Sequence, residues 1–232
     1  MTFGFSRSRR RPTIPDAEHP NASTKPPADL RAALSLADMT TKRPGFGIRD
    51  EAASILLAAH TPIATTTTVW ANGAMPLRCS AFDGPASLPD HLSGSVRCLV
   101  RVGGQLVCCE NEGGTHPWPG GRAEPGESIV ETAVREVHEE TGWFLLPDSV
   151  RVVGWLHYEH QAPMWEDYRL PYPDFFQTVV VGRADRRDAG HVADLDGGYE
   201  QRHWLESPET VPSLPRITPL AAPFLRYAFT ED

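Results

Sequence analysis

Residues 121–143 read GRAEPGESIVETAVREVHEETGW, a glycine-rich segment followed by a strongly periodic one. Glycines allow the first part to turn tightly, and Pro125 stiffens that turn. From about residue 128 to residue 141 apolar side chains recur at helical spacing, and Gly142 stands where a C-terminal helix cap belongs. The stretch therefore predicts a tight loop that leads directly into an amphipathic helix.

Three glutamates of this predicted helix share one face, because Glu136, Glu139 and Glu140 stand at i, i+3 and i+4. Like charges at this spacing destabilise a helix by about 0.2–0.5 kcal/mol per pair, and the negative end of the helix dipole disfavours them further. A bound divalent cation removes both penalties, and Mg²⁺ prefers oxygen ligands of this kind. A solvated acidic face is the alternative interpretation. The glycine-rich turn, the spacing and Arg135 favour the metal site.

The segment resembles the Nudix box, whose pattern is a glycine, a glutamate, and then Arg-Glu-U-x-Glu-Glu-x-Gly-U at fixed spacing, with U a bulky aliphatic residue. The matching positions are Gly121, Glu127, Arg135, Glu136, Val137, Glu139, Glu140 and Gly142. Trp143 departs from the last aliphatic position but is still bulky and apolar, so the departure concerns local packing more than chemistry. On these residues the chain is identified as a member of the Nudix hydrolase family.

The resemblance implies a divalent metal, Mg²⁺ or Mn²⁺, held by Glu136 and Glu140. Glu139 is expected to be a further ligand or a base just outside the ligands, and the Gly120 carbonyl is expected to supply another oxygen. Arg135 is expected to support the site by holding a carboxylate through a bidentate hydrogen bond.

Carboxylates outside this helix face are further candidates. Glu127 is expected to brace the loop against the helix, by pairing with Arg135 or by reaching the metal through water; the alternative is a carboxylate that only compensates the helix dipole. Glu200 precedes Trp204 in a Glu-x-x-x-Trp segment similar to the strand that closes many Nudix domains. We expect a catalytic or metal-linked role for Glu200, with Glu159 as its rival.

Aromatic side chains gather in a long segment after the next predicted strand. Trp165, Tyr168 and Tyr172 stand there beside charged residues, a composition that suits stacking on a base or gripping a ligand. They are the predicted substrate-binding residues. His157 and His160 are interpreted as exposed loop histidines that contact phosphate at most, not as catalytic groups.

The remaining pattern predicts an α+β fold. Strands and hairpins are expected at residues 63–82, 95–110, 150–160, 175–183 and 200–204, and a short or broken helix at 217–229. Strands on both sides of a central helix, with a second helix at the end, describe an α/β/α sandwich with a central mixed sheet. This is the fold that the Nudix resemblance implies.

Three segments are expected along the chain. Residues 1–28 lack periodicity and are predicted to be disordered. Residues 29–89 form an N-terminal extension with short helices at 29–39 and 48–60 and a β-hairpin, and residues 90–232 form the Nudix hydrolase domain. In this family such extensions often shape a dimer or the substrate site, so a homodimer is an open expectation.

The charge distribution limits the class of partner. The net charge is −8 at pH 7, yet residues 1–50 carry nine basic and five acidic side chains, so the rest of the chain is strongly acidic. An acidic body argues against binding to nucleic acid polymers. A phosphorylated small molecule remains a suitable partner, because a metal ion at the carboxylates inverts the local charge.

Neither a membrane span nor an oxidising compartment is expected. No apolar run reaches the length of a transmembrane helix. The cysteines, Cys79, Cys98, Cys108 and Cys109, lack metal-ligand spacing and are interpreted as small buried residues of a protein in the reducing cytoplasm.

The leading functional hypothesis is a metal-dependent hydrolase that cleaves a pyrophosphate bond in a nucleoside diphosphate linked to another moiety. Nucleotide sugars and dinucleotides rank above nucleoside triphosphates, because of the N-terminal extension alone. An isopentenyl diphosphate isomerase-like enzyme is the alternative that Cys108, Cys109 and His116 suggest, although the box is more intact than such isomerases carry. The third is a non-catalytic nucleotide-binding sensor, against which the complete set of carboxylates counts.

Overall fold

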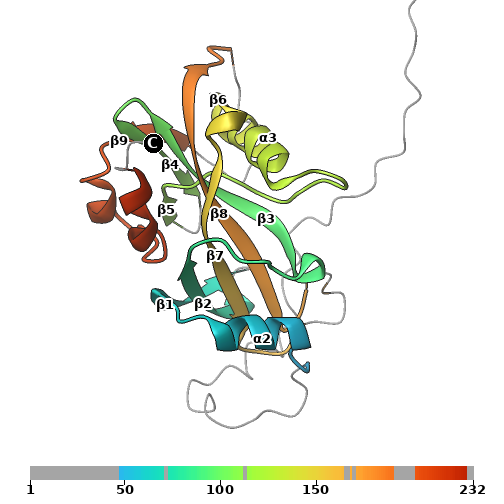
Figure 1. The fold of residues 1–232 in the computed structure, drawn as a ribbon. Coiled ribbons are helices and arrows are strands. Elements are labelled where there is room, and N and C mark those ends of the chain that lie inside the picture. The colour runs from blue at the N-terminus through green and yellow to red at the C-terminus, as the bar shows by residue number, and fades with distance from the viewer. Residues whose placement is uncertain are drawn as a thin grey trace, which may run out of the picture.

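The computed structural model describes residues 47–70, 73–111, 114–164, 168, 171–190 and 202–228. Within them a single curled sheet runs in the order β1-β2-β7-β8-β3-β4-β5, with β9 paired to β4 and β6 paired to β8 (Figure 1). The strands are β1 (Ala64–Trp70), β2 (Met75–Asp83), β3 (Ser93–Val102), β4 (Gln105–Asn111), β5 (Gly114–His116), β6 (Trp143–Leu145), β7 (Arg151–His160), β8 (Asp174–Arg187) and β9 (Arg202–Glu206). The sheet is mixed, as predicted, because β3 runs parallel to β8 whereas the other neighbours are antiparallel.

The described helices are few and short. They are α2 (Glu51–Ala59), α3 (Ile129–Thr141) and the 3-10 helices η3 (Asp90–Leu92), η4 (Pro147–Ser149), η5 (Val211–Ser213) and η6 (Ala222–Ala228). The predicted C-terminal helix is reduced to the 3-10 helix η6. Its second residue, Pro223, has no backbone N–H to donate to a hydrogen bond. No helix in this part of the chain is long and apolar enough to cross a membrane.

Helix α3 forms where the sequence predicts it, and its ends explain why. Ser128 caps the N-terminus in a capping box with Glu131, and Gly142 ends the helix in the left-handed conformation at φ 72°. Ala133 and Val137 are fully buried against β3 and β8. Burial of an aliphatic side chain of this size contributes about 1.5–3 kcal/mol, so the apolar stripe fixes which face of α3 remains for the glutamates.

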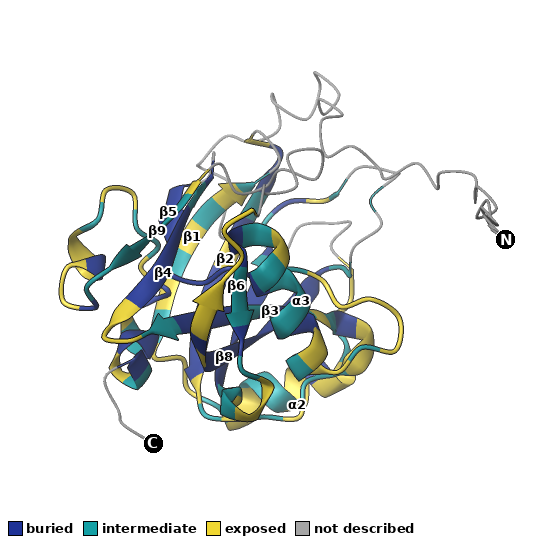
Figure 2. Cartoon of the chain, turned by 90° about the horizontal axis from the view of Figure 1, so that it is seen from above, coloured by how far each residue is buried: buried dark blue, intermediate teal, exposed yellow. Residues whose placement is uncertain are grey.

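The two faces of the sheet are covered differently. Helices α3 and α2 pack on one face, the latter through Ala53 against Phe82, Trp155 and Phe176. The C-terminal segment with η6 covers the other face, where Phe224 is fully buried. Figure 2 shows the buried residues gathered along the strands and the outer side of α2 exposed. This arrangement is the predicted α/β/α sandwich.

The hairpin formed by β1 and β2 belongs to the same sheet. Strand β2 pairs with β7 over the register from Leu77 opposite His160 to Asp83 opposite Gly154. Leu77 and Cys79 are fully buried in the main core cluster. The predicted helix at residues 29–39 lies outside the described residues.

Candidate active site

The loop before α3 lies directly on β3. Cys98 donates its backbone N–H to the Pro119 carbonyl at 2.9 Å, and Val96 donates to the Gly121 carbonyl at 2.9 Å. Gly120 has φ 146°, and a Cβ atom there would stand 2.2 Å from the Val96 carbonyl oxygen. Only glycine therefore allows the loop to approach the strand this closely.

Two carboxylates of α3 converge on this loop. Glu140 accepts a hydrogen bond from the Gly120 N–H at 2.8 Å. The carboxylate of Glu136 lies so close to Gly121 that an added Cβ would be 2.4 Å from its Oε2. The spacing on one helix face and the close approach of the glycine loop thus bring Gly120, Glu136 and Glu140 together.

Arg135 connects the other glutamates. Its guanidinium donates to both oxygens of Glu127, at 2.7 and 2.9 Å, and its Nη1 donates to Glu136 and Glu139 at 2.9 Å each. Nη2 also donates to the Arg122 carbonyl at 2.7 Å. The hydrogen bonds from Arg135 are the main reason that the pKa of Glu127 falls to about 2. Glu127 is therefore a fixed anion that ties the loop to the helix through Arg135.

The three helix glutamates have different environments. Burial raises the pKa of Glu136, and the positive charges of Arg135 and Arg97 only partly offset that effect. The Glu139 side chain is 51% exposed. A partly buried carboxylate whose ionised form is disfavoured is stabilised by a cation, and hard cations prefer oxygen donors.

The fit to a metal ion depends on oxygens besides side-chain carboxylates. Over the described ranges, no group of three or more His, Cys, Asp and Glu side chains is arranged to hold a metal. Glu136 and Glu140 supply two carboxylates at the backbone of Gly121 and Gly120. The carbonyl of Gly120, which accepts a hydrogen bond from Arg97, is a third oxygen of the same loop. This set of donors suits Mg²⁺ or Mn²⁺.

Arg97 is a site residue that the sequence reasoning missed. From β3 its Nη1 donates to the Gly120 carbonyl at 2.6 Å, and its Nε lies 3.5 Å from Gln177 Oε1. Tyr158 donates its hydroxyl to the same Gln177 oxygen at 3.0 Å. A charged side chain between Val96 and Cys98, within a strand whose other central residues are apolar, is the signal that could have found it.

The aromatic residues predicted to bind substrate, Tyr168 and Tyr172, have different surroundings. Tyr168 donates to or accepts from His160 Nε2 at 2.7 Å, and burial raises its pKa to about 12 while Arg122 of the loop opposes the rise. The ring of Tyr172 faces Gly47 instead, since a Cβ on that glycine would stand 3.1 Å from the ring. Trp165 and Glu200 lie outside the described residues.

The interpretation of His157 and His160 as exposed loop histidines is wrong, although the strand expected at residues 150–160, which contains both, is confirmed as β7. Both lie on β7, with exposures of 3% and 1%. Burial is tolerated because their ring nitrogens have partners: His157 Nε2 is 2.6 Å from Asp174, and His160 Nδ1 is 2.8 Å from the Pro173 carbonyl.

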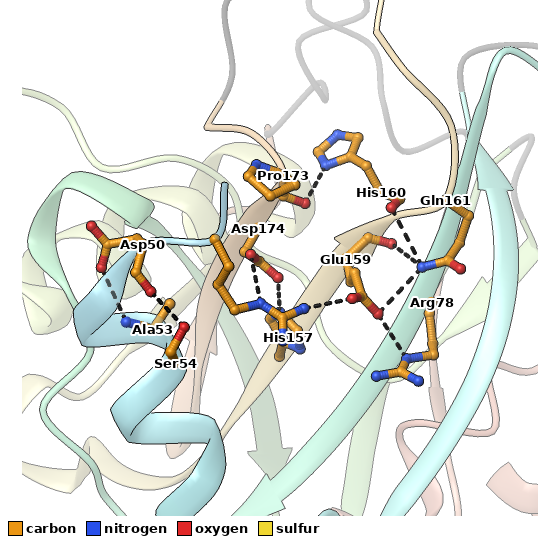
Figure 3. A network of polar contacts seen from close by, with 11 residues as sticks. Asp50, Ala53, Ser54, Arg78, His157, Glu159, His160, Gln161, Pro173 and Asp174 are labelled. Carbon is orange, nitrogen blue, oxygen red and sulfur yellow. Dashed lines mark hydrogen bonds and ion pairs between the residues drawn. The ribbon is translucent and has the colours of Figure 1, made fainter. Parts of the chain in front are cut away.

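Glu159 belongs to a polar network on the α2 side of the sheet (Figure 3). It forms ion pairs with Arg49 and, at 2.9 Å, with Arg78. Arg49 also bonds Asp174 at 2.9 Å, so the network joins the segment before α2 to β7 and β8. These contacts with Arg49 and Arg78 give Glu159 a structural role on this side of the sheet.

The cysteines that suggested isomerase chemistry are inaccessible. Cys108 and Cys109 have 0% exposure, and burial raises the pKa of the Cys108 thiol to about 12. A reactive cysteine needs access and a lowered pKa, so their environment argues against a catalytic thiol.

Comparison with known proteins agrees with this geometry. The NUDIX domain model matches residues 92–228. Mouse "Nucleoside diphosphate-linked moiety X motif 6" is 31% identical over 109 residues, which are 44% of this chain and 31% of that protein. The "Putative 8-oxo-dGTP diphosphatase YtkD" of Bacillus subtilis is 46% identical over 44 residues, 19% of this chain and 28% of that protein. The chain thus spans about a third or less of these curated relatives.

Among solved structures, a mutant of the Bacillus subtilis pyrophosphohydrolase BsRppH has a TM-score of 0.47 and 18% identity, covering 70% of this chain and 94% of that one. A NUDIX hydrolase from Nitrosomonas europaea has a TM-score of 0.43 and 21% identity, covering 58% and 86%. The family match spans more than half of the chain and contains the loop and helix α3 described above. The chain therefore belongs to the Nudix family.

Proposed function

We propose that the protein is a metal-dependent hydrolase that cleaves a pyrophosphate bond in a nucleoside diphosphate linked to another moiety. The observation that carries the proposal is the convergence of the Glu136 and Glu140 carboxylates on the backbone of Gly120 and Gly121. Mg²⁺ or Mn²⁺ would be held by these two carboxylates and the Gly120 carbonyl. Such an ion, when bound, polarises phosphate oxygens and lowers the pKa of a coordinated water.

The residues of the chain have separate tasks in this proposal. Glu136 and Glu140 would hold the metal ion at the glycine loop. Glu139 is the most solvent-accessible of the three glutamates and accepts the proton of the attacking water at its carboxylate. Arg135 fixes the relative positions of Glu127, Glu136 and Glu139 by its hydrogen bonds. Glu200 stays a predicted further carboxylate of the site.

The substrate class rests on two kinds of support. The names of the two relatives refer to nucleoside diphosphate-linked and nucleoside triphosphate compounds, which share the pyrophosphate bond. The acidic body of the chain suits a small phosphorylated substrate better than a nucleic acid polymer. Within the class, nucleotide sugars and dinucleotides remain ranked above nucleoside triphosphates because of the N-terminal extension, for which a homodimer is also proposed. The four free buried thiols suit the reducing cytoplasm.

The test is a substrate screen of the full chain with Mg²⁺, with Mn²⁺ and with excess chelator. Nucleotide sugars, dinucleotides, nucleoside triphosphates and isoprenyl diphosphates are compared by the phosphate, pyrophosphate or nucleoside monophosphate released. The proposal expects turnover of a nucleotide substrate only with metal. Turnover that continues undiminished in chelator contradicts the metal, and conversion of an isoprenyl diphosphate without phosphate release indicates the isomerase alternative. Nucleotide binding without any turnover indicates the sensor.

A further inference from the structure

Arg97 occupies the oxygen that the proposed metal site needs. Its Nη1 donates to the Gly120 carbonyl at 2.6 Å, the short distance typical of a charge-assisted hydrogen bond. The same guanidinium acts on Glu136, whose ionised form it stabilises through space. A cation supplied by β3 is thus already present at the carbonyl of the glycine loop.

The Gly120 carbonyl oxygen cannot bind a guanidinium and a metal ion favourably at the same time. They compete for the same carbonyl oxygen, and two cations in contact repel each other. The geometry points to an exchange: Arg97 leaves the Gly120 carbonyl when a divalent cation binds there, and its guanidinium then binds a phosphate oxygen of the substrate. This inference rests on the proposed function and deepens it.

The surroundings of Arg97 keep its head group at the site after such an exchange. Its Nε lies 3.5 Å from Gln177 Oε1, and Tyr158 donates to that oxygen at 3.0 Å. Gln177 and Tyr158 are only 6% and 5% exposed, and the Tyr158 ring stacks on Phe175 with 4.6 Å between centroids. The Nε side of the guanidinium therefore lies beside a buried acceptor that is itself fixed by Tyr158.

Release of the Gly120 carbonyl would leave Nη1 of Arg97 beside the glycine loop, where a phosphate oxygen could take the place of that carbonyl. The Nη1 group points at Gly120, next to the carboxylates that would carry the ion. A guanidinium presents several N–H donors in one plane and matches phosphate oxygens better than any other side chain. Arg97 is in this view both a competitor of the metal and a ligand of the substrate.

The two proposed roles of Arg97 predict opposite effects of its removal on metal affinity and on substrate affinity. A purely structural role predicts that both affinities decrease. Removal of Arg97 frees the Gly120 carbonyl and removes a nearby positive charge, so the metal-binding affinity of the substrate-free protein should increase. The same removal deletes a contact to phosphate, so the affinity for substrate should decrease. Simple damage to the loop would weaken both.

The experiment compares the full-length wild-type protein with Arg97→Met and Arg97→Gln. Arg101→Met is the matched control, because it removes the same charge from the same strand about 13 Å away, beyond the screening length at physiological salt. Mn²⁺ binding is titrated without substrate by calorimetry, and KM is then measured at saturating Mn²⁺. A net charge-assisted hydrogen bond corresponds to roughly tenfold or more in affinity. We expect Mn²⁺ to bind about tenfold more tightly to both Arg97 variants and KM to rise about tenfold, with changes under about twofold in the control.

Each other outcome decides against the inference. Unchanged or weaker Mn²⁺ binding in Arg97→Met and Arg97→Gln, with melting temperatures near that of the wild type, means that Arg97 only supports the loop. Tighter Mn²⁺ binding with an unchanged KM means that Arg97 competes with the metal but does not bind the phosphate of the substrate. If Arg101→Met binds Mn²⁺ as much more tightly as the Arg97 variants do, the gain in affinity results from the lower net positive charge and not from release of the Gly120 carbonyl. If the wild-type protein binds no Mn²⁺ and hydrolyses none of the nucleotides, the proposed function itself fails, and this inference fails with it.

Discussion

The carboxylate of Glu140 accepts a hydrogen bond from the backbone N–H of Gly120 at 2.8 Å. This contact ties the last turn of α3 to the loop that precedes the helix by nearly ten residues. Because Gly120 is itself pressed against β3, the position of one glutamate is set by helix, loop and sheet together. The same carboxylate is a proposed metal ligand, so its chemistry and its structural contact can be separated by mutation.

Glu140→Gln should lower turnover severely without unfolding the protein. The Gln side chain can still accept the Gly120 N–H, but loss of a charged metal ligand should lower kcat by roughly a hundred- to ten-thousand-fold. Repulsion among the glutamates decreases, so the free energy of unfolding without metal should be unchanged or slightly larger. The measurements are steady-state kinetics and urea denaturation. Glu131→Gln is the matched control on the same helix, because glutamine also serves in a capping box; ordinary activity in Glu140→Gln would contradict the assignment.

Gly120→Ala should destabilise the fold and the site together. The backbone conformation at φ 146° is strained for any residue with a Cβ, and that Cβ would stand 2.2 Å from the Val96 carbonyl. We expect a loss of about 2–4 kcal/mol in the free energy of unfolding, from the strain and the forced movement of the loop. Gly104→Ala is the control, since nothing lies within 4 Å of an added Cβ there. Equal stability of the two variants would show that the loop moves without cost.

Stability should decrease as the pH falls below about 6.5. Burial lowers the pKa of His160 from its ordinary value of 6.5, although the hydrogen bond to Pro173 opposes this. Below pH 6.5 the unfolded chain therefore binds a proton at His160 that the folded chain does not, and the free energy of unfolding falls. Urea denaturation between pH 8 and 5 measures the slope. In His160→Phe the protein is less stable throughout, but its slope in this range should be smaller; an unchanged slope would mean that His160 does not contribute.

A second loss of stability is expected at more acidic pH. Burial acts to raise the pKa of Asp174, but hydrogen bonds from His157 and Arg49 outweigh it and leave the pKa below 3.8. A carboxylate with a lowered pKa stabilises the folded state above pH 3.8 and loses this contribution as the pH falls through its folded pKa. Comparison of wild type with Arg49→Met at pH 7 and pH 3 tests this. The difference in their unfolding free energies should be smaller at pH 3; an equal or larger difference would contradict it.

Replacement of the buried cysteines should distinguish hydrolase from isomerase chemistry. Cys108→Ala and Cys109→Ala lose core packing, so a modest decrease in melting temperature is expected. Specific activity on the best nucleotide substrate, per folded molecule, should stay within a few-fold of the wild type. Loss of activity with an intact circular dichroism spectrum would instead favour a catalytic thiol.

Local features of the fold could be predicted from the sequence because their causes are local. The capping residues Ser128 and Gly142, the apolar stripe of α3 and the glycine-rich turns act within a few residues of each other. The helix, both hairpins and the burial of the cysteines were confirmed for this reason. The Nudix spacing likewise identified which glutamates share a helix face.

The failures concern contacts between distant parts of the chain. His157 reads as an exposed polar residue until its partner Asp174 is known, and nothing near Glu159 in the sequence predicts its pairing with Arg49. Arg97 contacts Gly120 only because the loop before α3 is hydrogen-bonded to β3, the strand that carries Arg97. Such partners are set by strand order, which local periodicity does not contain.

The pairing of β2 with β7 also limits when the sheet can fold during synthesis. Strand β2 can pair with β7 only after His160, the partner of Leu77, has been synthesised. Arg49 likewise bonds Asp174, which lies 125 positions later in the chain. Contacts of such long sequence separation form slowly, because the entropy of closing the intervening chain is lost first. During translation, the apolar side of β2 stays uncovered until most of the chain has left the ribosome. A variant that begins at residue 90 would lack β1 and β2. Strand β7 would then be an unpaired edge of the sheet, open to pairing with other chains.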